Sequence, residues 1–185
     1  MMKKDLIIKR INKLPAQLQR IIFICRDLAA REKIDVYLVG GFVRDLLLGV
    51  DNFDLDIVVE KNGIDFAYKL SKILGAHIIK HRAFGTATIT QKDGFKIDIA
   101  TSRKESYLEP AALPLVSAGN IQDDLLRRDF TINAIACHID FEKFGQLVDV
   151  CCGIKDLRKG YVRFLHEKSF IDDPTRIIRA VRFEQ

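Results

Sequence analysis

Hydrophobic residues recur at helical spacing after Pro15 and then give way to short apolar runs. The helical stripe consists of Leu18, Ile21, Ile22, Cys25, Leu28 and Ala29. The runs that follow predict strands, which we expect at 36–39, 55–59, 78–79, 87–90 and 95–100. A turn is expected at Asp93-Gly94, and helices are expected at 42–48 and 64–74. The first hundred residues therefore mix strands and helices.

The second half of the chain has a different pattern. Residues 101–120 contain two prolines and a Gly-Asn pair and are predicted to be mostly loop. A strong helix is predicted over 123–138, and the segments 147–150 and 162–164 are predicted to form a short hairpin. Asp173-Pro174 begins a last helix.

This order of elements predicts an α+β head followed by the start of an all-helical region. Residues 1–14 are basic and lack a clear period, so they are expected to be irregular. We divide the chain into a basic leader with a helix over 1–35, the head over 36–150, and the end of the head with the beginning of the helical region over 151–185.

The net charge of +5 does not by itself locate a nucleic-acid site. Residues 1–35 hold nine Lys and Arg against four Asp and Glu, and residues 36–185 hold twenty-one of each. The whole basic excess therefore lies in the first 35 residues. The rest of the composition, with 48% hydrophobic and 30% charged residues over 185 positions, is that of an ordinary globular domain.

The cysteines and the apolar runs indicate a cytoplasmic protein with no membrane segment. None of the four cysteines forms a C-x-x-C pair, and Cys151 and Cys152 are adjacent, so all four are expected to be reduced thiols. Lys9 and Arg10 interrupt any signal-like apolar stretch, and no run approaches the ~18 residues of a membrane span. The four histidines show no metal-ligand spacing.

Two carboxylates in the second predicted strand are the first candidate for chemistry. Asp54 and Asp56 point to the same face of a strand, because side chains alternate. Neighbouring carboxylates repel each other, and Mg²⁺ removes that cost. Asp98, in the strand 95–100, would complete a cluster if the two strands are neighbours, and two Mg²⁺ ions about 4 Å apart could then serve phosphoryl or nucleotidyl transfer. The alternative is a solvated strand edge.

A pair of glycines between a strand and a helix is the second candidate. Gly40 and Gly41 let backbone N–H groups approach a phosphate at the helix N-terminus, and Arg44 adds a donor suited to phosphate. The alternative is a tight turn with Arg44 and Asp45 as surface residues.

Two arginine-rich segments complete the set. Asp129 and Asn133 share a face of the helix predicted over 123–138, with Arg127 and Arg128 just before them. Such a face can bind ribose hydroxyls and a triphosphate, although its composition alone favours a stripe of salt bridges.

The last helix has a structural explanation of its own. Asp173 suits the N-cap and Pro174 the first turn, and Arg176 can pair with Asp172 or Asp173. Arg179 and Arg182 extend a basic stripe along the same helix.

These segments, in this order, resemble the class II tRNA nucleotidyltransferase and bacterial poly(A) polymerase family, which belongs to the polymerase-β-like nucleotidyltransferases. The resemblance runs from about Tyr37 to Gln185. It rests on the motifs LVGGFVRDLLLG, DLDIVVE, AFGT, KIDIATSR, LRRDFTINAIA and DDPTRIIRAVRF. It implies a head with a mixed sheet of about five strands flanked by helices, followed by a helical neck.

The resemblance also implies a role for each candidate residue. Asp54 and Asp56 are similar to the metal-binding carboxylates of the catalytic motif, and Asp98 lies where the superfamily has a third. The residues similar to the triphosphate loop and the ribose-binding motif are Gly40, Gly41 and Arg44, and Arg128, Asp129 and Asn133. Those similar to the template that reads the incoming base are Asp173 and Arg176, with Arg179 in support.

Two departures from the family pattern are visible. The template usually begins with Glu, and this chain has Asp172 there. Family members also continue into helical regions that hold tRNA, whereas this sequence stops soon after the template motif. The stretch before Tyr37 resembles longer A-adding relatives, which favours an excised N-terminal fragment and the addition of adenosine.

The resemblance implies a template-independent transfer of AMP, with CMP as a second substrate, to the 3′ end of tRNA. ATP or CTP would be the donor, pyrophosphate would leave, and two Mg²⁺ ions would assist. The alternatives are a poly(A) polymerase on mRNA 3′ ends and a nucleotide-binding fragment without turnover. The sequence leaves the oligomeric state and the choice among A-, CC- and CCA-addition open.

Overall fold

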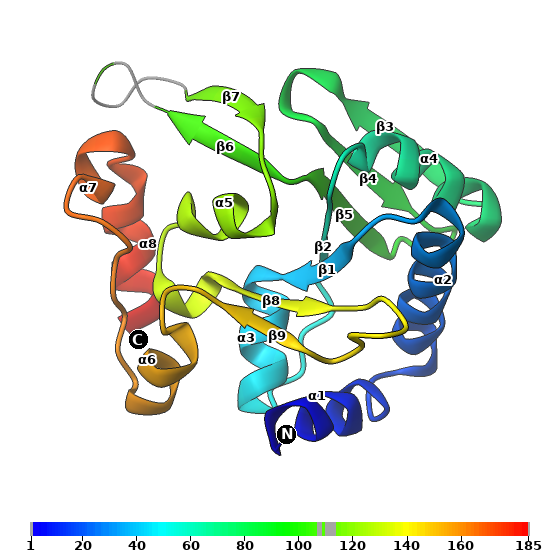
Figure 1. The fold of residues 1–185 in the computed structure, drawn as a ribbon, viewed down its shortest axis with the longest axis horizontal. Helices are drawn as coiled ribbons and strands as arrows, with labels where there is room; N and C mark the ends of the chain where they lie inside the picture. Colours follow the sequence, from blue (N-terminus) through cyan, green and yellow to red (C-terminus); the bar gives the residue numbers. More distant parts are fainter. Residues whose placement is uncertain (1, 107–108, 110–113, 185) are drawn as a thin grey trace.

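The computed structural model describes residues 2–106, 109 and 114–184, and a seven-stranded mixed sheet organises them (Figure 1). The strands lie in the order β3 (His77–His81), β4 (Thr86–Thr90), β5 (Lys96–Thr101), β2 (Leu55–Val59), β1 (Val36–Val39), β8 (Ile135–His138) and β9 (Leu147–Asp149). Strands β2 and β5 run parallel, and every other neighbouring pair is antiparallel.

One face of this sheet carries the main hydrophobic core. The helices that pack there are α1 (Met2–Ile11), α2 (Ala16–Glu32), α3 (Gly40–Leu48) and α4 (Gly63–Leu74). Leu55, Ile57 and Val59 of β2 point into this core, whereas Asp56 and Val58 point to the other face. The alternation expected for this strand is therefore confirmed.

The other face carries a smaller core and the C-terminal elements. These are α5 (Ile121–Leu126), the 3-10 turn η2 (Thr131–Asn133), α6 (Gly153–Lys159), α7 (Ser169–Asp172) and α8 (Thr175–Glu184). A second 3-10 turn, η1 (Arg82–Phe84), connects β3 to β4. Val39, Val58 and Leu125 belong to the smaller core. A two-stranded ribbon of β6 (Arg103–Ser106) and β7 (Leu115–Ala118) stands beside the sheet.

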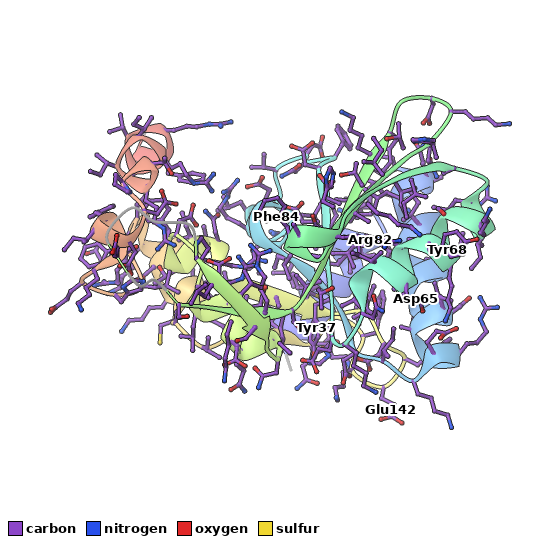
Figure 2. All side chains as sticks on the ribbon, turned by 90° about the horizontal axis from the view of Figure 1, so that it is seen from above. Tyr37, Asp65, Tyr68, Arg82, Phe84 and Glu142 are labelled. Carbon is purple, nitrogen blue, oxygen red and sulfur yellow. The ribbon has the colours of Figure 1, made fainter. Side chains whose placement is uncertain are left out.

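Helix α4 covers the outer strand β3 on the main-core side. Asn62 caps this helix by accepting a hydrogen bond from Asp65 N at 3.0 Å. Tyr68 lies on α4 (Figure 2), and the ammonium of Lys80, on β3, is 4.3 Å from the centre of its ring. Lys80 therefore faces α4, and its neighbours Ile79 and His81 face the opposite side of the sheet.

Several expected elements are wrong in the structure. Residues 2–11 are not irregular: they form α1, whose Ile7 and Ile11 are fully buried. Basic residues interrupt the apolar positions of this segment, so its helical period is weak in the sequence. Packing of Ile7 and Ile11 into the main core stabilises the helix. Part of 101–120 pairs as the β6–β7 ribbon; its residues 107–108 and 110–113 lie outside the described residues.

The helix expected over 123–138 is also wrong, since α5 ends at Leu126 and β8 begins at Ile135. The Asp129 carboxylate accepts a hydrogen bond from Phe130 N at 2.8 Å, in competition with helical bonding. The following apolar run is buried on both sides, and such a run does not distinguish a helix from a strand. Pairing with β1 decides for the strand.

The hairpin expected from 147–150 and 162–164 does not form. β9 pairs with β8 instead, and Phe164 makes an isolated bridge with Phe130. The sheet has more strands than the five expected because β8 and β9 join it.

The turn η2, which carries Asn133, packs directly against α6. A Cβ atom at Gly153 would lie 2.0 Å from the backbone oxygen of Thr131, so only glycine fits there. We expect Gly153→Ala to lower the free energy of unfolding by more than about 3 kcal/mol through overpacking. The measurement is the midpoint of urea unfolding.

Gly94→Ala is the matched control, because its Cβ would meet nothing within 4 Å. It bears only the strain of a positive φ of 86°, about 1–2 kcal/mol. Equal losses in the two variants would contradict the packing argument.

Candidate functional site

A polar cavity of about 800 Å³ lies between the smaller-core face of the sheet and helix α8. Every candidate site residue proposed from the sequence lines it except Asp54. Residues from the first, middle and last thirds of the chain therefore meet in one place.

The carboxylates form one wall of this cavity. Strands β2 and β5 pair in parallel with Asp56 directly opposite Asp98, which meets the condition set for the cluster. The Thr88 hydroxyl donates a hydrogen bond of 2.6 Å to Asp98 Oδ1. Asp54 lies one residue before β2 and is exposed, and its N–H donates to Asn52 Oδ1 at 2.8 Å.

The charge of Asp56 is held in an unfavourable place. Burial, the largest cause, and the negative charges of Asp98 and Asp54 together raise its pKa to about 6, and the Arg128 guanidinium opposes them. The paired carboxylates of Asp56 and Asp98 are hard oxygen donors of the kind that a divalent cation such as Mg²⁺ prefers.

Gly40 lines the cavity next to Asp56. It starts α3 directly after β1 with a positive φ of 67°, which favours glycine. A Cβ atom there would lie 2.9 Å from Arg128 Nη1 and 3.5 Å from Asp56 Oδ2. The N-terminus of a nine-residue helix thus borders the cavity without a side chain in the way.

Arg44 is held inside a network and is not the surface residue of the alternative interpretation. Its guanidinium donates to both Asp45 oxygens at 2.7 and 2.9 Å and to Asn133 Oδ1 at 2.8 Å. The guanidinium carbon also lies 5.0 Å from the centre of the Phe183 ring on α8. Arg44 therefore joins α3 to η2 and α8.

Asp129 and Asn133 meet although the helix expected to bring them together does not exist. Asn133 Nδ2 donates to Asp129 Oδ1 at 3.1 Å, because the chain turns through η2. Arg179 donates to Asp129 Oδ2 with Nε at 2.8 Å and Nη2 at 2.6 Å. This ion pair ties α8 to the head.

Arg128 is anchored through both ends of its guanidinium. Its Nη2 donates to the fully buried Asp124 at 3.0 Å, and its Nη1, on the side of Gly40 and Asp56, donates to the Asn133 carbonyl oxygen at 3.5 Å. Among the described residues, its Nε is the one buried side-chain polar atom without a hydrogen-bond partner. The Arg128 side chain lines the cavity near Asp56, so its charge is available to an anionic group bound there.

Asp173 and Arg176 both have structural work in the last helix. Asp173 Oδ1 accepts hydrogen bonds from Thr175 N at 3.0 Å and Thr175 Oγ1 at 2.5 Å, which confirms the expected N-cap. Arg176 is buried and donates to Ser169 Oγ at 2.7 Å and to the Arg127 carbonyl oxygen at 3.1 Å. Its Nε lies 3.6 Å from Asp173 Oδ2.

Sequence reasoning missed several residues of the cavity wall. Thr88, Glu105 and Phe183 line it, and Arg127 donates to Glu105 Oε1 at 3.1 Å. The alternation of threonines along 86–90 was the available signal for Thr88. Nothing local in the sequence marked Glu105, because the ribbon that carries it was expected to be loop.

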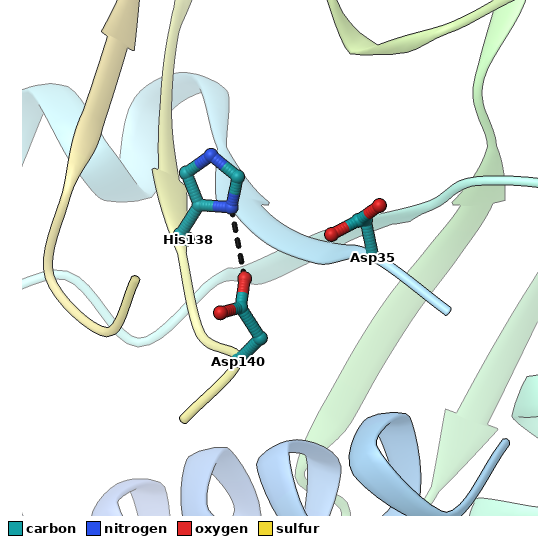
Figure 3. Close-up of side chains that lie close together, drawn as sticks. All are labelled: Asp35, His138 and Asp140. Atoms are coloured by element: carbon teal, nitrogen blue, oxygen red, sulfur yellow. Dashed lines mark hydrogen bonds and ion pairs between the residues drawn. The ribbon is translucent and has the colours of Figure 1, made fainter. Parts of the chain in front are cut away.

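A second group of possible metal ligands lies away from the cavity. Asp35, His138 and Asp140 have ligand atoms within 4.8 Å of one another, and His138 Nδ1 is 2.9 Å from Asp140 Oδ2 (Figure 3). Asp35 precedes β1, at the end opposite Gly40. Lys143 Nζ lies 3.7 Å from Asp35, so the group already has a counter-charge.

Other predictions concern the whole chain. The four cysteines are free thiols, as expected. No helix among the described residues is long and apolar enough to cross a membrane.

Comparisons with known proteins agree on one family. The chain is 46% identical over 157 residues to an A-adding tRNA nucleotidyltransferase of Halalkalibacterium halodurans, covering 85% of this chain and 37% of that protein. It is 48% identical over 153 residues to the A-adding tRNA nucleotidyltransferase of Geobacter sulfurreducens, covering 83% and 17%.

The structure is similar to that of the Thermotoga maritima CCA-adding enzyme complexed with tRNA, with a TM-score of 0.83 and 42% identity over 99% of this chain and 40% of that one. The chain thus spans less than half the length of these relatives. The family model described as the poly A polymerase head domain matches residues 36–163. With the mixed sheet and the polar cavity described above, this match establishes that the chain belongs to the poly A polymerase head domain family.

Proposed function

We propose that this protein transfers AMP from ATP to the 3′ end of tRNA and releases pyrophosphate, with CTP as a second donor to be tested. The observation that carries the proposal is the cavity in which paired carboxylates face an incompletely bonded arginine across a helix N-terminus. The A-adding relatives, at 46% and 48% identity, support adenosine over other substrates.

In this reaction the tRNA 3′ oxygen bonds to the α-phosphorus of ATP while the bond from that phosphorus to the pyrophosphate oxygen breaks. Asp54 and Asp56 would hold Mg²⁺, with Asp98 beside them. When bound, Mg²⁺ neutralises the phosphate charge and makes the attacking hydroxyl more acidic. Gly40 and Gly41 leave the N-terminus of α3 open to the triphosphate, and Arg44 and Arg128 supply its counter-charges.

The remaining cavity residues would recognise the nucleoside. Asp129 and Asn133 present acceptors and donors to the ribose hydroxyls, and Arg179 holds Asp129 from α8. Asp173 Oδ2 and the Arg176 guanidinium lie side by side at the start of α8, where they would read the base edge. Asp173 can cap its helix and contact the base together, because the cap uses Oδ1 alone.

The proposed function also assigns a role to each part of the chain and a compartment to the protein. The head over 36–150 would supply the chemistry, and the segment 151–185 would supply the base-reading helix. Four free cysteines fit a reducing compartment, and we place the protein in the cytoplasm.

Asp54→Ala should abolish Mg²⁺-dependent incorporation of labelled ATP into tRNA that ends in CC, because the cation loses one of its carboxylates. Asp51→Ala is the matched control: Asp51 is also exposed and lies three residues earlier, outside the pair formed by Asp54 and Asp56, so this variant should keep full activity. Retained activity in the Asp54 variant would overturn the proposal.

Single-nucleotide incorporation distinguishes the possible substrates. We expect one AMP to be added to tRNA ending in CC, and little product on tRNA ending in C or on oligo(A). CMP addition would indicate a CC- or CCA-adding protein, long products on oligo(A) would indicate a poly(A) polymerase, and ATP binding without any product would indicate a binding module.

The raised pKa of Asp56 makes stability depend on pH in metal-free buffer. The folded protein keeps this proton up to about pH 6, whereas the unfolded chain loses it near pH 4, so stability should fall as the pH rises through this window. Asp56→Asn removes the charge and should be more stable than wild type at pH 7.5 by about 1–3 kcal/mol.

The measurement is the free energy of unfolding against pH, with a chelator present. The difference between the two proteins should vanish near pH 4, and added Mg²⁺ should raise the melting temperature of wild type alone. If Asp56→Asn were less stable than wild type at pH 7.5, burial and repulsion could not make the Asp56 charge unfavourable in the folded protein.

A further inference from the structure

Strand register extends the carboxylate wall across the sheet. Asp56 pairs with Asp98, Asp98 with Thr88, and Thr88 with Ile79. Residues directly opposite each other on neighbouring strands share a face. These four side chains therefore form one row that runs from the cavity to the outer strand β3.

Two parallel rows flank it. Ala100, Thr86 and His81 form the row on one side, and Lys96, Thr90 and His77 form the row on the other. The outer strand thus presents His77, Ile79 and His81 on the face of the carboxylates, and we call these three residues the outer strip.

The outer strip is open. Ile79 is 49% exposed, and both histidines are exposed. The buried side of the same strands, with Ile78, Ala87 and Ile97, packs against the main core, and Lys80 lies over Tyr68 of α4 (Figure 2). The outer strand therefore exposes an isoleucine between two histidines, in the same row as Asp56 and Asp98.

The geometry of the reaction indicates that the RNA primer approaches from the side of β3. In-line displacement places the attacking oxygen and the leaving pyrophosphate on opposite sides of the phosphorus. The triphosphate site at Gly40, Gly41 and Arg44 and the base-reading helix α8 lie on one side of β2 and β5, and β3 lies on the other (Figure 1). The RNA that carries the attacking oxygen therefore enters over β4 and β3.

We propose that the outer strip binds the single-stranded nucleotides that precede the 3′-terminal nucleotide of the RNA primer. This inference rests on the proposed function. Strands are about 4.8 Å apart, so Ile79 lies roughly 10 Å from Asp98, near enough for the nucleotide before the attacking one. Its apolar surface suits the face of a base or ribose.

The surrounding groups match a nucleic-acid backbone. His77 and His81 offer ring N–H donors and Lys96 a positive charge to phosphates, and the threonine hydroxyls of β4 can bond 2′-hydroxyl groups. The turn after β3 adds Arg82 and the exposed Phe84, at 55% (Figure 2). Asp98 is the only acid in these three rows outside Asp56.

The test compares two exposed isoleucines on opposite sides of the sheet. Ile79→Glu places a negative charge on the outer strip, and Ile73→Glu does the same on α4, where Ile73 is 45% exposed. KM for tRNA ending in CC, KM for ATP and kcat are measured on the intact protein. Ile79→Glu should raise KM for tRNA by at least about fivefold, the smallest effect of losing a base contact, and leave KM for ATP unchanged.

A second readout separates this inference from the proposed function. Binding of a short single-stranded RNA ending in ACC, followed by fluorescence anisotropy without turnover, should weaken in Ile79→Glu and not in Ile73→Glu. Wild type that binds this RNA but adds no nucleotide would overturn the proposed function and leave the strip standing. The proposed role of the outer strip would be overturned if Ile79→Glu bound both the tRNA and the short RNA as tightly as wild type. It would also be overturned if KM for ATP rose as much as KM for tRNA.

Discussion

The parallel pairing of β2 with β5 is the constraint on which the rest of the site depends. It sets Asp56 directly opposite Asp98, on the face of the sheet that points away from the main hydrophobic core. Two carboxylates at this spacing are unfavourable together, and burial of Asp56 adds to the cost. The fold tolerates the pair because the same strands bury Ile57 and Ile97 in the main core on their other face.

Positive charge gathers around that wall from distant parts of the chain. Arg128 reaches Asp56 only because Gly40 has no side chain, and it is held in place by the fully buried Asp124. Arg127 binds the same Asp124 carboxylate through its other oxygen, at 2.6 Å. One buried acid thus fixes two neighbouring arginines, and the two ion pairs offset part of the cost of taking the Asp124 carboxylate out of water.

The last helix is joined to the head by ion pairs, by hydrogen bonds and by the Phe183 ring, whose centre lies 5.6 Å from that of Phe130. Arg179 pairs with Asp129, and Arg176 donates to the Arg127 backbone, so the position of α8 follows that of the segment 127–129. Ile177, Ile178 and Val181 remain exposed on the same helix. A ligand that competes for Asp129 would also act on the position of α8.

Local patterns in the sequence determined the parts of this protein that depend on near neighbours. Alternation determined the β2 strand and the face of Asp56, and the Asp-Pro pair determined the start of α8. Tertiary structure alone decided that residues 135–138 form a strand, because a run buried on both sides has no period to read. It also decided the meeting of Asp98 with Asp56 and of Arg179 with Asp129, since strand pairing and ion pairs across 42 and 50 residues leave no local signal.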